Sequence, residues 1–174
     1  MRRLVSALLL CLAAQAAGAL QVAAVKPAQV KGAAAAEFSF GPFAVAGITW
    51  EGGAVVLPAT ENKGRKYTDI KLLSKGLYGR LETCFKNGCA PAKGGPAPKA
   101  KVESVKPLKS PVRVANAEIS IDGELLVTAG VMASKKEEGA FWVAFPPALV
   151  FTDGAFKSAV ESAVIAAWTK KGKK

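Results

Sequence analysis

The sequence predicts an α+β fold built from two tandem units, each an antiparallel sheet followed by a C-terminal helix. Three observations lead to this prediction. Short sequence blocks recur about 80 residues apart in the same order. Apolar and polar residues alternate within those blocks, which is typical of half-buried strands. The period then changes to that of a helix at the end of each unit.

The repeat consists of four pairs of matching segments. In chain order, residues 22–27 match 102–107, 36–40 match 117–121, 46–48 match 129–131, and 53–58 match 140–146 in character. Chains rich in alanine produce chance matches, so a single pair is weak evidence. Four pairs in the same order, at similar spacing, indicate a duplication.

Turn residues separate the predicted strands. Asp122-Gly123 and Gly52-Gly53 supply the glycine that tight hairpin turns need for a positive φ, and residues 134–139 form a longer charged loop. The strands in each unit are therefore expected to form antiparallel meanders.

Two amphipathic helices are expected to cover the sheets. Their apolar positions are Ile70, Leu73, Leu77 and Leu81 in the first unit and Phe156, Val160, Val164 and Trp168 in the second. Gly76 and Gly79 each weaken the first helix by about 1 kcal/mol relative to alanine.

The predicted domain organisation has five parts. Residues 1–19 form a signal peptide, 20–86 the first unit, 87–101 a linker rich in Pro, Gly and Lys, 102–169 the second unit, and 170–174 a basic tail. The linker has no apolar period and is expected to be extended and semi-flexible.

The leader combines a positive start, an apolar run too short to span a bilayer, and the small-x-small pattern Ala17-Gly18-Ala19. It predicts export, to the periplasm or the medium, with cleavage after Ala19; cleavage after Ala16 is the alternative. A cytoplasmic location follows if the leader is not functional.

The chain is strongly basic. Without Arg2 and Arg3 of the leader, 22 basic residues face 13 acidic ones, a net charge of about +9. This surplus suits an anionic partner such as nucleic acid, an anionic lipid surface or an acidic wall polymer. Lysines scattered through tails and linkers also keep a protein soluble, and composition does not separate the two explanations.

The second unit carries motifs that resemble a known family. They are Val102-Glu103-Ser104-Val105, residues 117–122 (AEISID), residues 141–146 (FWVAFP), residues 152–156 (TDGAF) and a helix through Ala163-Val164. In this order they resemble the septation regulator SpoVG (stage V sporulation protein G) family of small bacterial proteins. The resemblance covers residues 102–168 and, more faintly, 22–84.

The resemblance implies a curved antiparallel sheet with a C-terminal helix, dimers that pair through their sheets, and a link to septation and to gene regulation through DNA or RNA binding. Two copies in one chain are then expected to form an intramolecular pseudo-dimer, monomeric in solution. The family's basic contacts lie in the loop after the strand that ends in proline. In the first unit this loop, residues 59–67, carries Lys63, Arg65 and Lys66; in the second, the loop 147–151 has no basic residue.

Enzyme activity is not expected, and neither is a metal or a cofactor. The sequence has no histidine, which removes the commonest general base and zinc ligand. Asp69, Asp122 and Asp153 are isolated residues of turns or caps, and no phosphate-binding glycine motif is present.

Cys84 and Cys89 are the two cysteines that remain once the leader, with Cys11, is removed. In an oxidising compartment they predict a disulfide at the end of the first helix, worth about 2 kcal/mol by loop entropy.

Two classes of function remain open. The first is a non-enzymatic SpoVG-like module that binds DNA, RNA or another polyanion through Lys63, Arg65 and Lys66. The second is an exported structural or interaction protein that keeps the fold and uses its sheet, or the apolar loop 146–151, against an envelope or septal protein.

Overall fold

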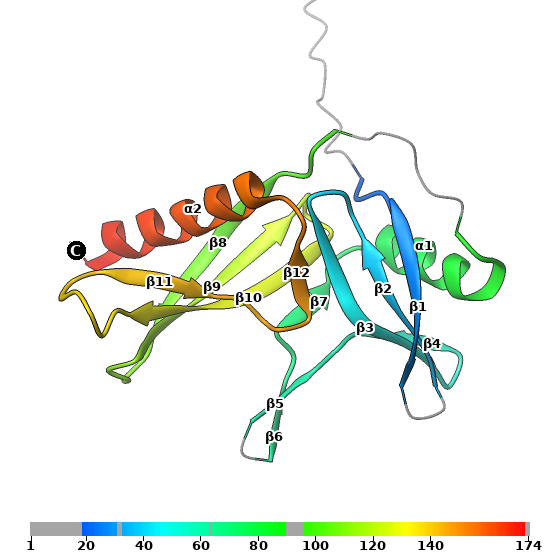
Figure 1. Ribbon diagram of the computed structural model, residues 1–174, viewed down its shortest axis with the longest axis horizontal. Coiled ribbons are helices and arrows are strands. Elements are labelled where there is room, and N and C mark those ends of the chain that lie inside the picture. Colours follow the sequence, from blue (N-terminus) through cyan, green and yellow to red (C-terminus); the bar gives the residue numbers. More distant parts are fainter. Residues whose placement is uncertain (1–18, 31–32, 63, 90–95, 173–174) are drawn as a thin grey trace, which may run out of the picture.

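The structure is a computed structural model that describes residues 19–30, 33–62, 64–89 and 96–172 (Figure 1). The predicted leader lies outside these residues except for Ala19. Lys63, the middle of the predicted linker, and Lys173 and Lys174 also lie outside them.

The described residues form twelve strands and two helices. The first half of the chain contains β1 (Ala24–Val30), β2 (Ala33–Ser39), β3 (Phe43–Glu51), β4 (Ala54–Val56), β5 (Thr60–Asn62), β6 (Arg65–Tyr67), β7 (Ile70–Leu72) and α1 (Lys75–Asn87). The second half contains β8 (Ala100–Pro107), β9 (Arg113–Ile121), β10 (Leu125–Ala133), β11 (Phe141–Ala144), β12 (Leu149–Phe151) and α2 (Gly154–Gly172).

The strands form two five-stranded antiparallel sheets and one separate hairpin. The first sheet has the order β1-β2-β3-β12, with β4 also paired to β3; the second has the order β11-β10-β9-β8, with β7 also paired to β10. Strands β5 and β6 pair only with each other. Helix α2 runs along one face of the second sheet, and α1 lies beside the first (Figure 1). The predicted α+β class is confirmed.

Each sheet takes one short strand from the other half of the chain. Strand β12 pairs with the first three residues of β3, with Leu149 opposite Val45 and Phe151 opposite Phe43. Strand β7 pairs in the same way with the first three residues of β10. In both strands the first residue is buried, the second exposed and the third half-buried. Strands β7 and β12 are therefore equivalent in the position of their pairing, in their antiparallel direction and in which of their residues face the core.

The residues before each helix are also held by the opposite half. The Leu73 amide donates to the carbonyl of Glu124 in the β9–β10 turn (N···O 2.8 Å), and the Thr152 amide donates to the carbonyl of Pro42 in the β2–β3 turn (3.0 Å). Ser74 then caps α1, because its hydroxyl oxygen accepts from the Leu77 amide (3.0 Å). Asp153 caps α2, because its carboxylate accepts hydrogen bonds from the amides of Ala155 (2.7 Å) and Phe156 (3.0 Å).

One hydrophobic core joins the two halves. It contains Leu20, Phe38, Phe43, Ile48, Ile70, Leu77 and Leu81 from the first half and Ile121, Leu125, Val127 and Leu149 from the second. A second core lies under α2, where Val160 and Val164 pack on the alanine-rich face of β9. The ring of Phe156, at the start of α2, stacks on Phe43 at 6.0 Å between centroids and packs against both cores.

Two predicted elements differ from the structure. Ile70 is buried in strand β7, and Leu73 is exposed before the cap of α1, so the helix uses only Leu77 and Leu81 of the four predicted positions. The predicted loop 147–151 contains strand β12, whose Leu149 side chain lies in the shared core. Both errors concern three-residue strands, which are too short to show a period of two.

The bounds of the linker and the tail also differ. Helix α1 extends through Asn87, and β8 begins at Ala100, two residues before the predicted second unit. Lys170 and Lys171 belong to the last turn of α2, where Lys171 donates a hydrogen bond to the carbonyl of Val105. Cations at a helix C-terminus are favoured by the helix dipole.

The exchanged strand β12 offers a paired test of this packing. We expect Leu149→Ala to destabilise the protein by about 2–4 kcal/mol, because it leaves a cavity in the shared core. Val150, on the opposite face, is 40% exposed, and Val150→Ala should cost less than about 1 kcal/mol. Urea unfolding of both variants, followed by circular dichroism, measures the difference. Equally small losses of unfolding free energy in the two variants would contradict the packing of β12 in the shared core.

Candidate nucleic-acid interface

The candidate site is the basic hairpin, which we define as residues 60–67. It projects beyond both sheets, on the side away from α2 (Figure 1). Its strands are in register from Thr60 opposite Tyr67 to Asn62 opposite Arg65. Gly64 has a φ of +72°, a conformation that glycine adopts without strain and that the turn requires.

The cations of the basic hairpin point to both of its faces. Arg65 and Lys66 are consecutive residues of β6, so their side chains lie on opposite faces of the two-stranded ribbon. Both are exposed, and Tyr67, on the same face as Arg65, is 45% exposed. Lys63 lies outside the described residues. Arg65 and Lys66 therefore lie on the two sides of the ribbon.

Within the part of the chain that the structure describes, neither Arg65 nor Lys66 has an acidic side chain within 4.0 Å. The nearest carboxylate along the ladder is that of Glu61, which lies opposite Lys66 in the register. Lys71 follows in β7 and is exposed. It is close enough to Glu118 to help lower the pKa of that carboxyl. Arg65 and Lys66 of the basic hairpin are thus available to an anion, whereas Lys71 already interacts with Glu118.

Elsewhere on the second sheet, two lysines are paired with carboxylates. On the face opposite α2, Glu118 accepts hydrogen bonds from Ser104 (2.6 Å) and Lys106 (2.9 Å), which lower its pKa in that order of effect. Hydrogen bonds from Ser120 and Lys101 lower the pKa of Glu103 in the same way. Arg113 of the same sheet donates to the Asn116 side chain (2.8 Å) instead of a carboxylate.

The second half of the chain has no counterpart of the basic hairpin. Strand β11 ends at Ala144, and β12 begins at Leu149, so four residues join them, none of them basic. In the first half, the connection from β4 to β7 is long enough to contain β5 and β6. The site is therefore confined to one half, as the positions of the basic residues predict.

The structure contains a disulfide between Cys84 and Cys89, with the two Cα atoms 4.5 Å apart. It joins the last turn of α1 to the residue after Gly88. The amide of Gly88 donates a hydrogen bond to the Cys84 carbonyl (3.0 Å). Both cysteines pack at the edge of the shared core, near Phe85. The disulfide is at the C-terminal end of α1, whereas the basic hairpin precedes α1 in the sequence.

A second polar cluster was not predicted from the sequence. The carboxylate of Glu124 accepts hydrogen bonds from the Ser74 hydroxyl (2.7 Å), the Leu20 amide (2.7 Å) and the Arg80 guanidinium. Partial burial raises the pKa of Glu124. The hydrogen bonds from Arg80, Ser74 and Leu20 together lower this pKa by more than burial raises it, so the net shift is downward. No sequence pattern indicates this cluster, because its members are far apart in the chain.

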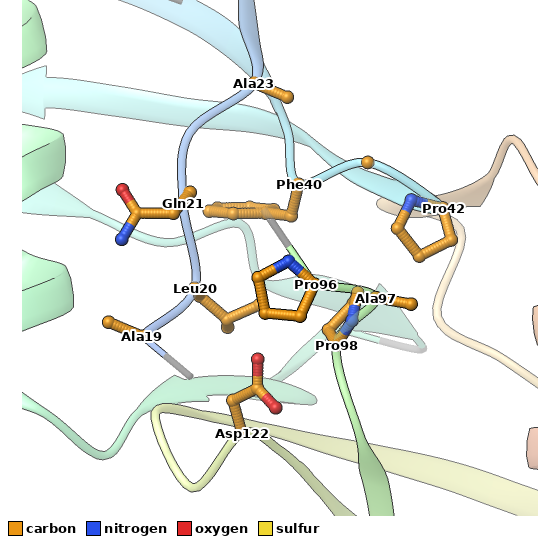
Figure 2. A pocket seen from close by; sticks show the side chains of 11 residues that line it. Ala19, Leu20, Gln21, Ala23, Phe40, Pro42, Pro96, Ala97, Pro98 and Asp122 are labelled. Carbon is orange, nitrogen blue, oxygen red and sulfur yellow. The ribbon is translucent and has the colours of Figure 1, made fainter. Parts of the chain in front are cut away.

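Leu20 of this cluster also lines a small cavity of about 200 Å³ (Figure 2). Its wall is mostly apolar and includes Leu20, Phe40, Pro96 and Pro98. Asp122 is the acidic residue in the wall, and its carboxylate accepts a hydrogen bond from the Lys99 amide (2.8 Å). The cavity borders residues 19–21, at the start of the described chain.

No family model, no curated protein and no solved structure matches this chain. The likeness to the SpoVG family thus depends on the motifs of the chain itself. Among the described residues, no group of three His, Cys, Asp or Glu side chains lies close enough together to hold a metal ion. None of the described helices is long and apolar enough to cross a membrane.

The disulfide generates a prediction about the compartment. In protein purified from its native location without reductant, we expect Cys84 and Cys89 to resist alkylation until a reductant is added, because oxidising compartments preserve such bridges. Mass spectrometry with two isotopic alkylating reagents measures the fraction of each thiol. Two thiols that are free in native protein would show that the bridge does not form there.

Proposed function

We propose that this protein is a non-enzymatic, SpoVG-like binding module that contacts DNA, RNA or a similar polyanion through the basic hairpin. The observation that carries the proposal is a projecting two-stranded ribbon with exposed cations on both faces. The motifs of the second half supply the link to septation and regulation. The absence of histidine from the sequence supports a binding role rather than catalysis.

The shape of the ribbon suggests how the contact is made. A two-stranded antiparallel ribbon fits the major groove of B-form DNA. With Arg65 and Lys66 on opposite faces, each wall of a groove would meet one cation. Such phosphate contacts fix the position of the protein without reading the base sequence. Exposed Tyr67 adds an aromatic surface on which an unpaired base could stack.

We also propose that the two halves form a pseudo-dimer, the internal equivalent of two chains of the family. The reciprocal pairing of β7 and β12 supports this proposal. So does a repeated ion pair: Lys26 contacts Glu37 at 3.1 Å, and Lys106 contacts Glu118 at 2.9 Å, at matching positions of the two copies. Exchange within one chain costs little entropy, because the covalent link keeps the local concentration of each half high.

The basic hairpin is tested by removing its charge. We expect the variant with Lys63, Arg65 and Lys66 changed to Ala to bind duplex DNA or RNA more weakly, with a salt-dependence slope reduced by up to about 3. The matched control changes three exposed cations elsewhere, Lys109, Lys135 and Lys136. Fluorescence anisotropy at several salt concentrations measures both slopes.

Two outcomes would contradict the assignment to the hairpin. One is an equal loss in the control variant, which would indicate general attraction to a basic surface. The other is an equal loss when Lys170, Lys171, Lys173 and Lys174 are neutralised, which would place the contact at the C-terminal end.

The pseudo-dimer proposal predicts that the intact chain is a monomer and that neither half is stable alone. Residues 20–89 lack the partner of β7, and residues 96–174 lack the partner of β12. We expect each half to be unfolded or self-associated when expressed alone, and the two to form a 1:1 complex when mixed. Light scattering across a concentration series measures these masses. A stable dimer of the intact chain, with halves that fold separately as monomers, would defeat the proposal.

A second candidate is an exported interaction protein that keeps this fold and does not bind nucleic acid. The disulfide favours it, because such bridges persist mainly in oxidising compartments. In the apolar segment 146–151, Leu149 is buried in the core, whereas Val150 is 40% exposed and can contribute to a contact surface. Trp142, 53% exposed on the edge strand β11, is also available. Recovery of protein with Met1 intact from the cytoplasm would favour the first candidate, and processed protein outside it the second.

A further inference from the structure

The start of the described chain is fixed in the fold by both its side chain and its backbone. The side chain of Leu20 is 2% exposed and belongs to the core that joins the two halves. Its amide nitrogen lies 2.7 Å from Oε2 of Glu124, at the turn between β9 and β10. Ala19, one residue earlier, is exposed. The backbone therefore passes from the surface to the interior between these two residues.

The carboxylate that receives the Leu20 nitrogen is held by α1. Oε1 of Glu124 accepts from the Ser74 hydroxyl at 2.7 Å, and Oε2 accepts from the Arg80 guanidinium as well as from Leu20. Gly76 leaves room for the cluster, since a Cβ atom there would lie 3.5 Å from Oε1 and 3.3 Å from the Ser74 hydroxyl oxygen. Three segments distant in sequence thus meet at one carboxylate.

The same place in the chain is one of the two predicted cleavage sites. Ala17-Gly18-Ala19 supplies the small residues that signal peptidase requires before the bond between Ala19 and Leu20. The alternative cut, after Ala16, would leave three further residues before Leu20. The sequence does not choose between the two cuts.

We propose that processing occurs between Ala19 and Leu20, and that the carboxylate of Glu124 is the binding site of the new N-terminal ammonium group. This inference rests on export, the second candidate function. Hydrolysis of the peptide bond consumes one water molecule and leaves a carboxylate on Ala19 and an amine on Leu20. The amine takes up a proton near neutral pH, because its ordinary pKa is about 7.7–8.0.

Cleavage would strengthen a contact that the precursor already makes. In the uncleaved chain, the Leu20 amide is a neutral donor with one hydrogen. After cleavage the same nitrogen has three hydrogens and a positive charge, so its hydrogen bond to the Glu124 carboxylate becomes an ion pair as well. The Glu124 side chain is 14% exposed, so water screens this pair less than it screens pairs on the open surface.

The geometry also distinguishes the two cuts. Cleavage after Ala16 would place the ammonium group on Ala17, three residues upstream, and would leave only an amide at Glu124. Cleavage after Ala19 places the charge at the nitrogen that already lies 2.7 Å from Oε2. The Glu124 site therefore favours Leu20 as the first residue of the mature protein.

The test compares three N-termini on the same chain: free Leu20, N-acetylated Leu20, and a form that retains Ala19. At about pH 6.5, we expect the free Leu20 form to melt about 5 °C above the other two. In Glu124→Gln the three forms should melt together. Asp122→Asn is the matched control, because Asp122 is in the same turn and Asn can still accept the Lys99 hydrogen bond; it should keep the difference.

A second measurement does not depend on the folding of the Gln variant. In the wild-type form that starts at Leu20, an amine-reactive reagent should label the N-terminal amine much more slowly in native protein than in urea. Equal labelling rates would overturn the proposal. So would equal melting temperatures of the three N-termini, or a difference that persists in Glu124→Gln.

The mass of the exported protein completes the test. A first residue of Leu20 is expected, and a first residue of Ala17 would overturn the proposal. Failure of the export candidate itself is a separate result, seen as protein with Met1 intact in the cytoplasm. The melting experiment on the three N-termini tests the Glu124 site independently of that result, and independently of binding by the basic hairpin.

Discussion

The exchange of β7 and β12 between the two halves is the constraint on which the rest of the structure depends. Each strand covers the first three residues of the other half's third strand, where Phe43 and Leu125 begin β3 and β10. The buried residues at these pairs, Ile70 and Leu149, enter one shared core. Because each sheet is completed by the opposite half, the two halves gain most of their stability together, and the described chain forms one packed unit.

This dependence still leaves room for the two halves to differ. The connection from β4 to β7 and the connection from β11 to β12 both lie between a meander and its exchanged strand. The short connection packs against the core through Phe145 and Ala148, whereas no described residue of β5 or β6 belongs to either core. A long insertion at such a surface position adds little entropy cost. The first half carries the basic hairpin there, and the second carries a short apolar turn. The residues of β6 are exposed, so a binding element can exist in one half without a cost to the shared core.

The sequence was sufficient for the parts of the fold that have a period. Apolar and polar residues alternate from Ala115 to Ile121 in the long strand β9, and α2 repeats every four residues through Val160 and Val164. The prediction of Ile70 in a helix was wrong, because its spacing to Leu77 suits a helix while Ile70 begins a three-residue strand. The cations of the hairpin are visible in the sequence, but their two-sided arrangement is not. Glu124 gave no signal, since Leu20, Ser74 and Arg80 meet it only in the folded chain.

Glu124 distinguishes one of two equivalent turns from the other. Its carbonyl accepts from Leu73 just before α1, as the carbonyl of Pro42 accepts from Thr152 just before α2. In both halves, a backbone carbonyl of the turn therefore accepts a hydrogen bond from the segment that precedes the opposite helix. Proline has no polar side chain to add, whereas the carboxylate of Glu124 also binds Ser74, Arg80 and the nitrogen of Leu20. One side chain at a repeated turn thus ties the start of the chain to the opposite half, at the point where the two copies already interlock.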